Sequence, residues 1–243
     1  MRIPRIHTSQ SLEPGLNISL EPEAARHIVQ VLRLRSGSEL VLFNGDGYNY
    51  SARLVSASKK HTQVEVLSES GPEQENILDI GLCIAISKGE RMDFAIQKSV
   101  ELGVSEITPL FTKRCVINLK GDRLQKREQH WRKVIISACE QSGRCRVPAL
   151  NNTIELDRWL DTPHQGTGLI LDPKSETSIG SLEKPGEKIS ILIGPEGGLT
   201  SAEIASAEKC GFKGISLGPR VLRTETAPLA AIASIQTLWG DFR

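Results

Sequence analysis

The spacing of apolar residues predicts a small, mainly β unit in the first 70 residues of the chain. Apolar residues recur at helical spacing over Glu21–Leu34, which predicts a helix there. Two apolar-rich segments, 39–43 and 48–55, flank the turn residues Asn44-Gly45-Asp46-Gly47 and predict a hairpin. A further strand is predicted over Gln63–Leu67.

From Ile77 onward the pattern changes to short apolar strands that alternate with helices. Strands are predicted at Leu78–Ile86, Ile107–Phe111, Gly168–Leu171, Ile189–Ile193 and Gly214–Leu217. Helices are predicted at Arg91–Leu102, Asp122–Ser142, Ser201–Cys210 and Thr226–Trp239, the third with a capping box of Thr200 and Glu203. This alternation is typical of an α/β fold, with a parallel sheet covered by helices on both faces.

The polar segment Ser68–Asn76 contains a Gly-Pro pair and separates the two patterns. We therefore expect two domains, one of residues 1–72 and one of residues 73–243.

Composition narrows the class of protein. Of 243 residues, 39% are hydrophobic and 24% are charged, as in a globular protein. No apolar run approaches the roughly 20 residues that cross a bilayer, and the N-terminus lacks the apolar core of a secretory signal, so a cytoplasmic protein is expected. The five cysteines are scattered without a CxxC pair, which predicts buried free thiols and no metal site.

The net charge of +1 hides an asymmetry. Basic residues outnumber acidic ones over residues 84–150, whereas acidic residues predominate over 151–243. The basic region fits either a face that binds a polyanion or a solvated helix face, and charge alone does not choose between them.

Candidate chemistry gathers after three of the predicted strands. Asp172-Pro173, the segment Gly194–Thr200 and the segment Leu217–Ala227 each follow an apolar strand. Because ligands of parallel sheets bind beyond the carboxyl ends of the strands, these loops predict a cofactor pocket. The chain lacks the GxGxxG, GxxxxGK[ST], GxSxG and HExxH motifs, which disfavours dinucleotide, nucleotide triphosphate, serine hydrolase and zinc protease chemistry.

The same loops carry a resemblance to a known family. GPEGGLT (194–200) and LGPRVLRTETA (217–227) resemble the cofactor-loop motifs of the RsmE-type 16S ribosomal RNA uridine-N3-methyltransferases of the SPOUT superfamily. KGERMDFAIQKSVELGV (88–104), EQSGR (140–144), HIVQVLRLRSG (27–37) and the N-terminal MRIPRI resemble other parts of that family.

The resemblance implies a small PUA-like β-barrel followed by a parallel-sheet α/β domain with a deep trefoil knot. It also implies a homodimer with each cofactor pocket beside the subunit interface. The implied reaction uses S-adenosylmethionine to methylate N3 of one uridine in 16S ribosomal RNA, within the assembled small subunit. Neither a membrane nor DNA is expected as a partner.

The three loops supply the residues that the resemblance assigns to the cofactor. They are Leu171, Asp172, Ile193, Gly194, Glu196, Gly197, Leu217, Gly218, Val221, Leu222, Thr224, Thr226 and Ala227.

The chemistry of a uracil N3 requires loss of its proton, because the lone pair is otherwise engaged. Arg223 could stabilise the resulting anion, or it could only form an ion pair with Glu225 that fixes the loop. Glu196, Glu225 and Glu140 are candidate proton acceptors, and the residues do not choose among them. The catalytic candidates are therefore Arg223, Glu225 and Glu196.

Basic side chains are the candidates for RNA phosphates. They are Arg2, Arg5, Arg33, Arg35, Lys88, Arg91 and Arg144, with Lys113 and Arg114 beside them. Aromatic residues make up only 4% of the chain, so a base-stacking platform is not predicted. Two alternatives stay open at this point, a non-catalytic RNA-binding factor and a knotted methyltransferase that acts on a ribose 2′-hydroxyl.

Overall fold

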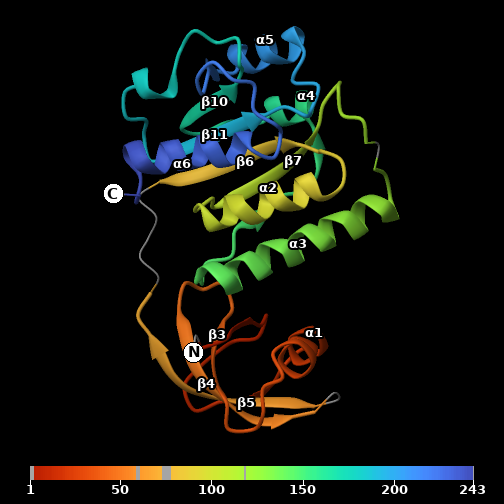
Figure 1. Ribbon diagram of the computed structural model, residues 1–243, viewed down its shortest axis with the longest axis vertical. Coiled ribbons are helices and arrows are strands. Elements are labelled where there is room, and N and C mark those ends of the chain that lie inside the picture. The colour runs from red at the N-terminus through yellow and green to blue at the C-terminus, as the bar shows by residue number, and fades with distance from the viewer. Residues whose placement is uncertain (1–2, 59–60, 73–77, 118, 243) are drawn as a thin grey trace. The chain divides into compact units, whose positions relative to one another are not determined.

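The computed structural model describes residues 3–58, 61–72, 78–117 and 119–242. Among them the chain forms two compact units, one from Met1–Glu75 with Ile136–Val147 and one from Asn76–Ile135 with Pro148–Arg243. The first unit is therefore discontinuous in sequence, because the end of a long helix and the residues after it belong to it. Figure 1 shows the helices and strands of both units.

The first unit contains a five-stranded sheet of order β1-β3-β4-β5-β2. Its strands are β1 (Arg5–His7), β2 (Asn17–Ser19), β3 (Glu39–Phe43), β4 (Asn49–Ala57) and β5 (Thr62–Ser70). The predicted hairpin is confirmed, since β3 and β4 pair antiparallel with Leu42 opposite Tyr50. The three-residue strands β1 and β2 were not predicted, because so short a segment carries no period-2 pattern.

The predicted helix over Glu21–Leu34 is shorter and less regular in the structure. An α-helix, α1 (Pro22–Arg26), continues as a π-helical turn, η1 (His27–Val31). Arg33 then takes a left-handed conformation with φ of 54°, and the Leu34 N–H donates to the Ile28 carbonyl at 3.1 Å. This turn ends the helix early and lets Leu34 pack against the core of the unit.

The second unit contains a parallel sheet of order β12-β10-β11-β6-β7-β8, with β9 also paired to β7. Its strands are β6 (Asp79–Ala85), β7 (Glu106–Phe111), β8 (Ala149–Leu150), β9 (Ile154–Glu155), β10 (Thr167–Leu171), β11 (Lys188–Ile193) and β12 (Lys213–Ile215). The five predicted strands are confirmed. β12 ends two residues early, because Ser216 makes only an isolated bridge to Ser178.

Helices cover both faces of this sheet, as predicted. They are α2 (Glu90–Glu101), α3 (Asp122–Ser142), α4 (Leu156–Leu160), α5 (Ser201–Lys209) and α6 (Ala227–Trp239), with a 3-10 turn η2 (Ile179–Ser181). On one face, Leu160 of α4 and Ala207 of α5 pack with Leu192 of β11. Figure 1 shows α2 and α6 side by side on the other face.

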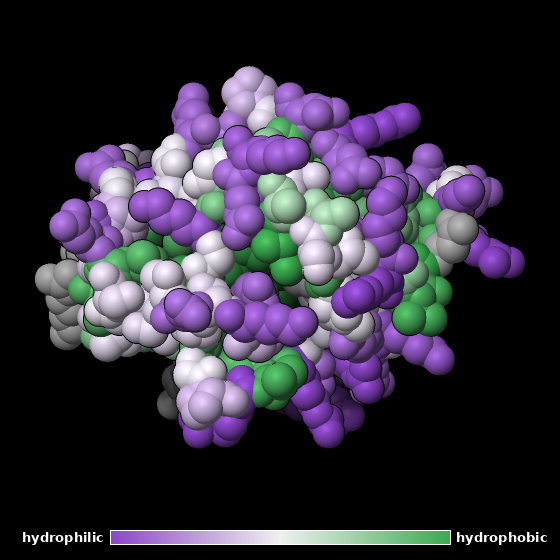
Figure 2. All heavy atoms as spheres, turned by 90° about the horizontal axis from the view of Figure 1, so that it is seen from above, coloured by the Kyte–Doolittle hydropathy of each residue, from purple (hydrophilic) through white to green (hydrophobic). Residues whose placement is uncertain are grey.

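The surface and the cysteines complete this picture. None of the described helices is long and apolar enough to cross a bilayer. The face in Figure 2 is mainly hydrophilic, with hydrophobic side chains in small groups. Cys83, Cys139 and Cys145 are buried free thiols as predicted, but Cys115 is half-buried and Cys210 is exposed. The prediction was wrong for Cys210 because it lies at the surface end of α5.

Candidate functional site

Three loops meet at one edge of the parallel sheet. β10 pairs in parallel with both β11 and β12, so the carboxyl ends of all three strands point the same way. The Asp172 N–H, just beyond β10, donates to the carbonyl of Ile215 at the end of β12 at 3.0 Å. The tertiary structure thus brings together the three segments that the sequence singled out.

The loop after β11 folds back on itself. The Gly198 N–H donates to the Pro195 carbonyl at 2.8 Å, and Gly198 has φ of 68°. A Cβ added to Gly194 would lie 2.8 Å from the Leu199 nitrogen and 3.0 Å from the Gly198 carbonyl carbon. Both are backbone atoms, so any side chain at position 194 displaces this loop.

The loop after β12 offers its backbone to a ligand. Its end is closed by the Arg223 carbonyl, which accepts from the N–H groups of Thr226 and Ala227 at 2.9 Å each. Among the described residues, no hydrogen bond uses the N–H groups of residues 218 and 220–222. Gly218 has φ of 90°, and the position of its missing Cβ is open space. This run of free donors beside an open space fits a flat heterocycle.

The predicted cofactor residues differ in exposure. Thr224 is buried and Ile193 ends a buried strand, whereas Val221 is 81% exposed. Leu171, Asp172 and Leu222 are half-buried. An apolar side chain as open as Val221 is available for contact with a bound molecule.

Glu196 is held by an ion pair. Its Oε1 accepts from Arg91 Nη1 at 3.0 Å and from the Lys88 N–H at 3.3 Å. Partial burial opposes ionisation, but hydrogen bonds from its own N–H, from Lys88 and from Arg91 outweigh this and lower the pKa of the Glu196 carboxyl. The carboxylate is therefore a weak base, and Arg91 is engaged in positioning this loop.

Arg223 and Glu225 form only a loose pair. Their closest charged atoms lie 4.0 Å apart, and the Arg223 side chain is 82% exposed against 16% for Glu225. An exposed pair at this distance contributes little to stability. The guanidinium of Arg223 is therefore free to turn toward a ligand.

The segment after β7 supports the loop after β11, a role that the sequence did not reveal. Arg114 Nη1 donates to the Gly197 carbonyl at 2.8 Å and to the Leu199 carbonyl at 3.3 Å. The Lys113 N–H donates at 2.8 Å to Glu203, whose buried carboxylate also completes the predicted capping box with Thr200. Arg114 was predicted to meet phosphates, yet here it positions the loop.

Glu140 belongs to the first unit. Its Oε1 accepts from the His7 N–H at 3.1 Å, and burial raises the pKa of its carboxyl above the ordinary value. In the same unit Arg5 donates to Asn49 Oδ1 at 2.6 Å and to the Arg144 carbonyl at 3.0 Å. Arg5 thereby links the segment after α3 to the sheet.

The other basic candidates lie at the surface. Arg33, Arg35 and Lys88 are exposed, and Arg144 is half-buried. Arg2 lies outside the described residues. Within the described part of the chain, no group of three His, Cys, Asp or Glu side chains could hold a metal ion.

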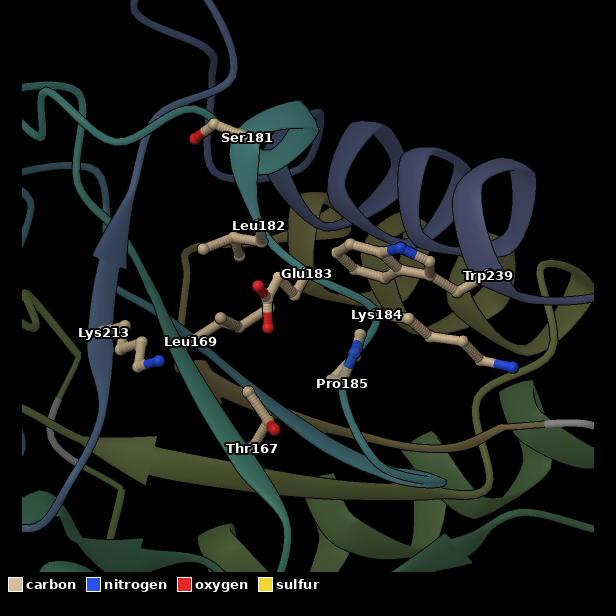
Figure 3. Close-up of a pocket in the computed structure, with 9 residues that line it drawn as sticks. All are labelled: Thr167, Leu169, Ser181, Leu182, Glu183, Lys184, Pro185, Lys213 and Trp239. Atoms are coloured by element: carbon tan, nitrogen blue, oxygen red, sulfur yellow. The ribbon is translucent and has the colours of Figure 1, made fainter.

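Figure 3 shows a pocket of about 300 Å³ that lies away from the three loops. Thr167 and Lys213, which begin β10 and β12, line it together with Trp239 and the segment 181–185. It therefore opens toward the amino ends of these strands, whereas the chemistry of parallel sheets lies at the carboxyl ends.

Comparison with known proteins agrees with this geometry. Residues 73–236 match the RNA methyltransferase domain family, and residues 20–67 match the RNA methyltransferase PUA domain. The ribosomal RNA small subunit methyltransferase E of Buchnera aphidicola subsp. Schizaphis graminum is 36% identical over 99% of this chain and 98% of its own length. The chain belongs to the ribosomal RNA small subunit methyltransferase E family. The Bacillus subtilis member is 29% identical, with 96% of each chain covered.

Solved structures place the same family in three dimensions. The family member of Neisseria gonorrhoeae bound to S-adenosylmethionine has a TM-score of 0.93 and 42% identity, and the match covers 100% of both chains. A methyltransferase of Legionella pneumophila in complex with the same cofactor has a TM-score of 0.96 and 39% identity, again over 100% of both chains. These matches confirm the predicted family and the α/β fold with an N-terminal PUA-like domain.

Proposed function

We propose that this chain uses S-adenosylmethionine to methylate N3 of one specific uridine in 16S ribosomal RNA of the small subunit, in the cytoplasm. The observation that carries this proposal is the meeting of three loops at one sheet edge in a family whose solved members bind that cofactor. The free N–H groups of residues 218 and 220–222 and the open space at Gly218 fit its adenine.

The proposed binding set is the one that the sequence indicated. It comprises Leu171, Asp172, Ile193, Gly194, Glu196, Gly197, Leu217, Gly218, Val221, Leu222, Thr224, Thr226 and Ala227. When bound, the cofactor supplies an electrophilic methyl group. The chain's own part is to hold the loops in shape, through Arg114 on the Gly197 carbonyl and Arg91 on Glu196.

The residues that meet the uracil have a second task. The N3 proton must leave before N3 can act as a nucleophile, and negative charge then spreads to O2 and O4. The exposed guanidinium of Arg223 can pair with that charge. Glu225 is the better proton acceptor of the two loop carboxylates, because Glu196 is already paired with Arg91 and has a lowered pKa.

Mass spectrometry of nucleosides tests the product. Small subunits from a strain that lacks this gene are incubated with the protein and S-adenosylmethionine, and their 16S RNA is digested. We expect N3-methyluridine with the natural protein and none with Gly194→Ala. A methylated ribose with an untouched N3 would contradict the assignment.

We further propose that the two domains, residues 1–72 and 73–243, divide RNA docking from cofactor binding. Arg33 and Arg35 are exposed in the first unit beside its left-handed turn. Replacing both with glutamine removes two phosphate contacts, so we expect a KM for small subunits about tenfold higher. The Kd for S-adenosylmethionine should stay unchanged in calorimetry. An unchanged KM would show that these arginines are only solvated surface charges.

The knot and the homodimer also belong to the proposal. On α6 the residues Ile232, Ile235 and Trp239 are buried within the described part of the chain, whereas Leu238 is 41% exposed. Phe94 of the neighbouring α2 is 44% exposed. These open apolar side chains on two adjacent helices are the face that a second copy would cover.

A further inference from the structure

A second hollow lies beyond the carboxyl end of β7 in the second unit. Its volume is about 540 Å³, within the size range of small-molecule sites. It is lined by Phe111, Thr112, Cys115, Ile117, Leu119, Lys120, Gly121, Leu124, Thr153, Ile154, Glu155 and Arg158. None of these residues is among the predicted cofactor, catalytic or RNA-binding residues.

We propose that this hollow is a nucleotide subsite, which accepts a base of the substrate RNA other than the uridine that is methylated. The inference rests on the proposed function, because it assumes that RNA is the substrate. It adds a binding site on the methyltransferase domain itself, where the sequence indicated only scattered surface charges.

The walls of the hollow suit a nucleobase. Phe111, Leu119 and Leu124 are half-buried, so each keeps apolar surface open to the cavity. A base presents a flat face that such surface can cover. The carboxylate of exposed Glu155 at the rim can accept a hydrogen bond from an N–H group on the base edge.

One polar atom in the wall lacks a partner. The Thr153 hydroxyl oxygen is buried and makes no hydrogen bond with the described residues, although the Thr153 N–H donates to Glu128 at 2.9 Å. A buried hydroxyl without a partner costs free energy, and a polar group of a bound base would remove that cost. By contrast, the Thr112 hydroxyl already contacts Cys115 Sγ at 3.3 Å.

The charges at the rim favour RNA. Lys120 and Arg158 are exposed on opposite segments of the wall, and only Glu155 opposes them among the lining residues. Two cations around an apolar hollow match a nucleotide, whose phosphate lies at the rim and whose base lies inside. The cationic rim favours an RNA strand over an acid-poor peptide of a ribosomal protein.

The hollow is tied to the cofactor loop by one segment of chain. Residues 111–117 line the hollow, and the same segment holds the loop after β11 through Arg114 on the Gly197 carbonyl and the Lys113 N–H on Glu203. An RNA strand whose target base lies at that loop can therefore place another nucleotide in the hollow.

Salt dependence of binding gives the first test. Lys120→Gln/Arg158→Gln is compared with the control Lys209→Gln/Lys184→Gln, which removes two exposed lysines elsewhere in the same unit. A uridine-rich single-stranded RNA oligonucleotide is titrated by fluorescence anisotropy at several salt concentrations. We expect the slope of log K against log salt to fall by about two for the first variant relative to the control. Equal slopes in the two variants would overturn the proposal.

Photocrosslinking locates the base directly. The same oligonucleotide with 4-thiouridine is irradiated on the natural protein, and crosslinked peptides are mapped by mass spectrometry. We expect crosslinks within residues 111–124 or 153–158, and their loss in Leu124→Trp, which fills the hollow. Crosslinks only at the three cofactor loops would overturn the proposal.

Methylation assays separate this inference from the proposed function. If small subunits are methylated at N3 and the hollow variants behave as the control, the subsite is wrong and the function stands. If no RNA is methylated but the crosslinks lie in the hollow, the reaction is wrong and the RNA subsite stands. A defect on intact subunits without any defect on free RNA would assign the hollow to a ribosomal protein and contradict the proposal.

Discussion

Gly194→Ala is expected to bring S-adenosylmethionine binding below detection in calorimetry. The added Cβ would lie 2.8 Å from the Leu199 nitrogen, and backbone atoms at that distance can be relieved only by moving the loop after β11. The free energy of unfolding should change far less than the binding, because the loop lies at the surface edge of the sheet.

Two further glycines make this experiment specific. Gly180→Ala is the control, since a Cβ there meets open space and its φ is not positive; its affinity should equal that of the natural protein. Gly218→Val tests the ligand itself, because a Cβ at Gly218 also meets no atom of the chain. Loss of binding in Gly218→Val would mean that the side chain occupies the cofactor's space. Natural affinity in both Gly194→Ala and Gly218→Val would show that the pocket lies elsewhere.

Arg223→Ala is expected to slow single-turnover methyl transfer about 100-fold, the usual effect of removing one group that stabilises a developing anion. Arg223→Lys should fall between, because it keeps the charge and loses the planar fork. The Kd for S-adenosylmethionine should change little in either, since the side chain is 82% exposed and loosely paired. Arg220→Ala, also exposed in the same loop, is the matched control.

The pH profile separates catalysis from loop support. If departure of the N3 proton limits the rate, the natural protein's single-turnover rate rises with pH, and Glu225→Gln removes part of that rise. If Arg223 and Glu225 only fix the loop, both variants lower the rate and the melting temperature together and leave the shape of the profile unchanged. That second pattern would refute the catalytic assignment.

Much of the second unit could be predicted because each element carries a strong local signal. The five apolar strands, α3 from Asp122 to Ser142 and the capping box of Thr200 and Glu203 all follow from patterns within a few residues. The short strands β1, β2, β8 and β9 could not be predicted, because they exist only through pairing with distant partners. The early end of the helix at Arg33 was missed because a left-handed arginine gives no signal in the sequence.

The sequence by itself determined which loops carry the chemistry and to which family the chain belongs, since glycine-rich motifs after apolar strands are local features. Only the tertiary structure decided what the charged residues do. Arg91 pairs with Glu196, Arg114 holds the Gly197 carbonyl, and Arg5 binds Asn49, although all three arginines looked alike as candidates for phosphate. The physical reason is that a long cationic side chain takes its role from whichever acceptor the fold brings within about 3 Å. Those acceptors lie 105, 83 and 44 residues away along the chain.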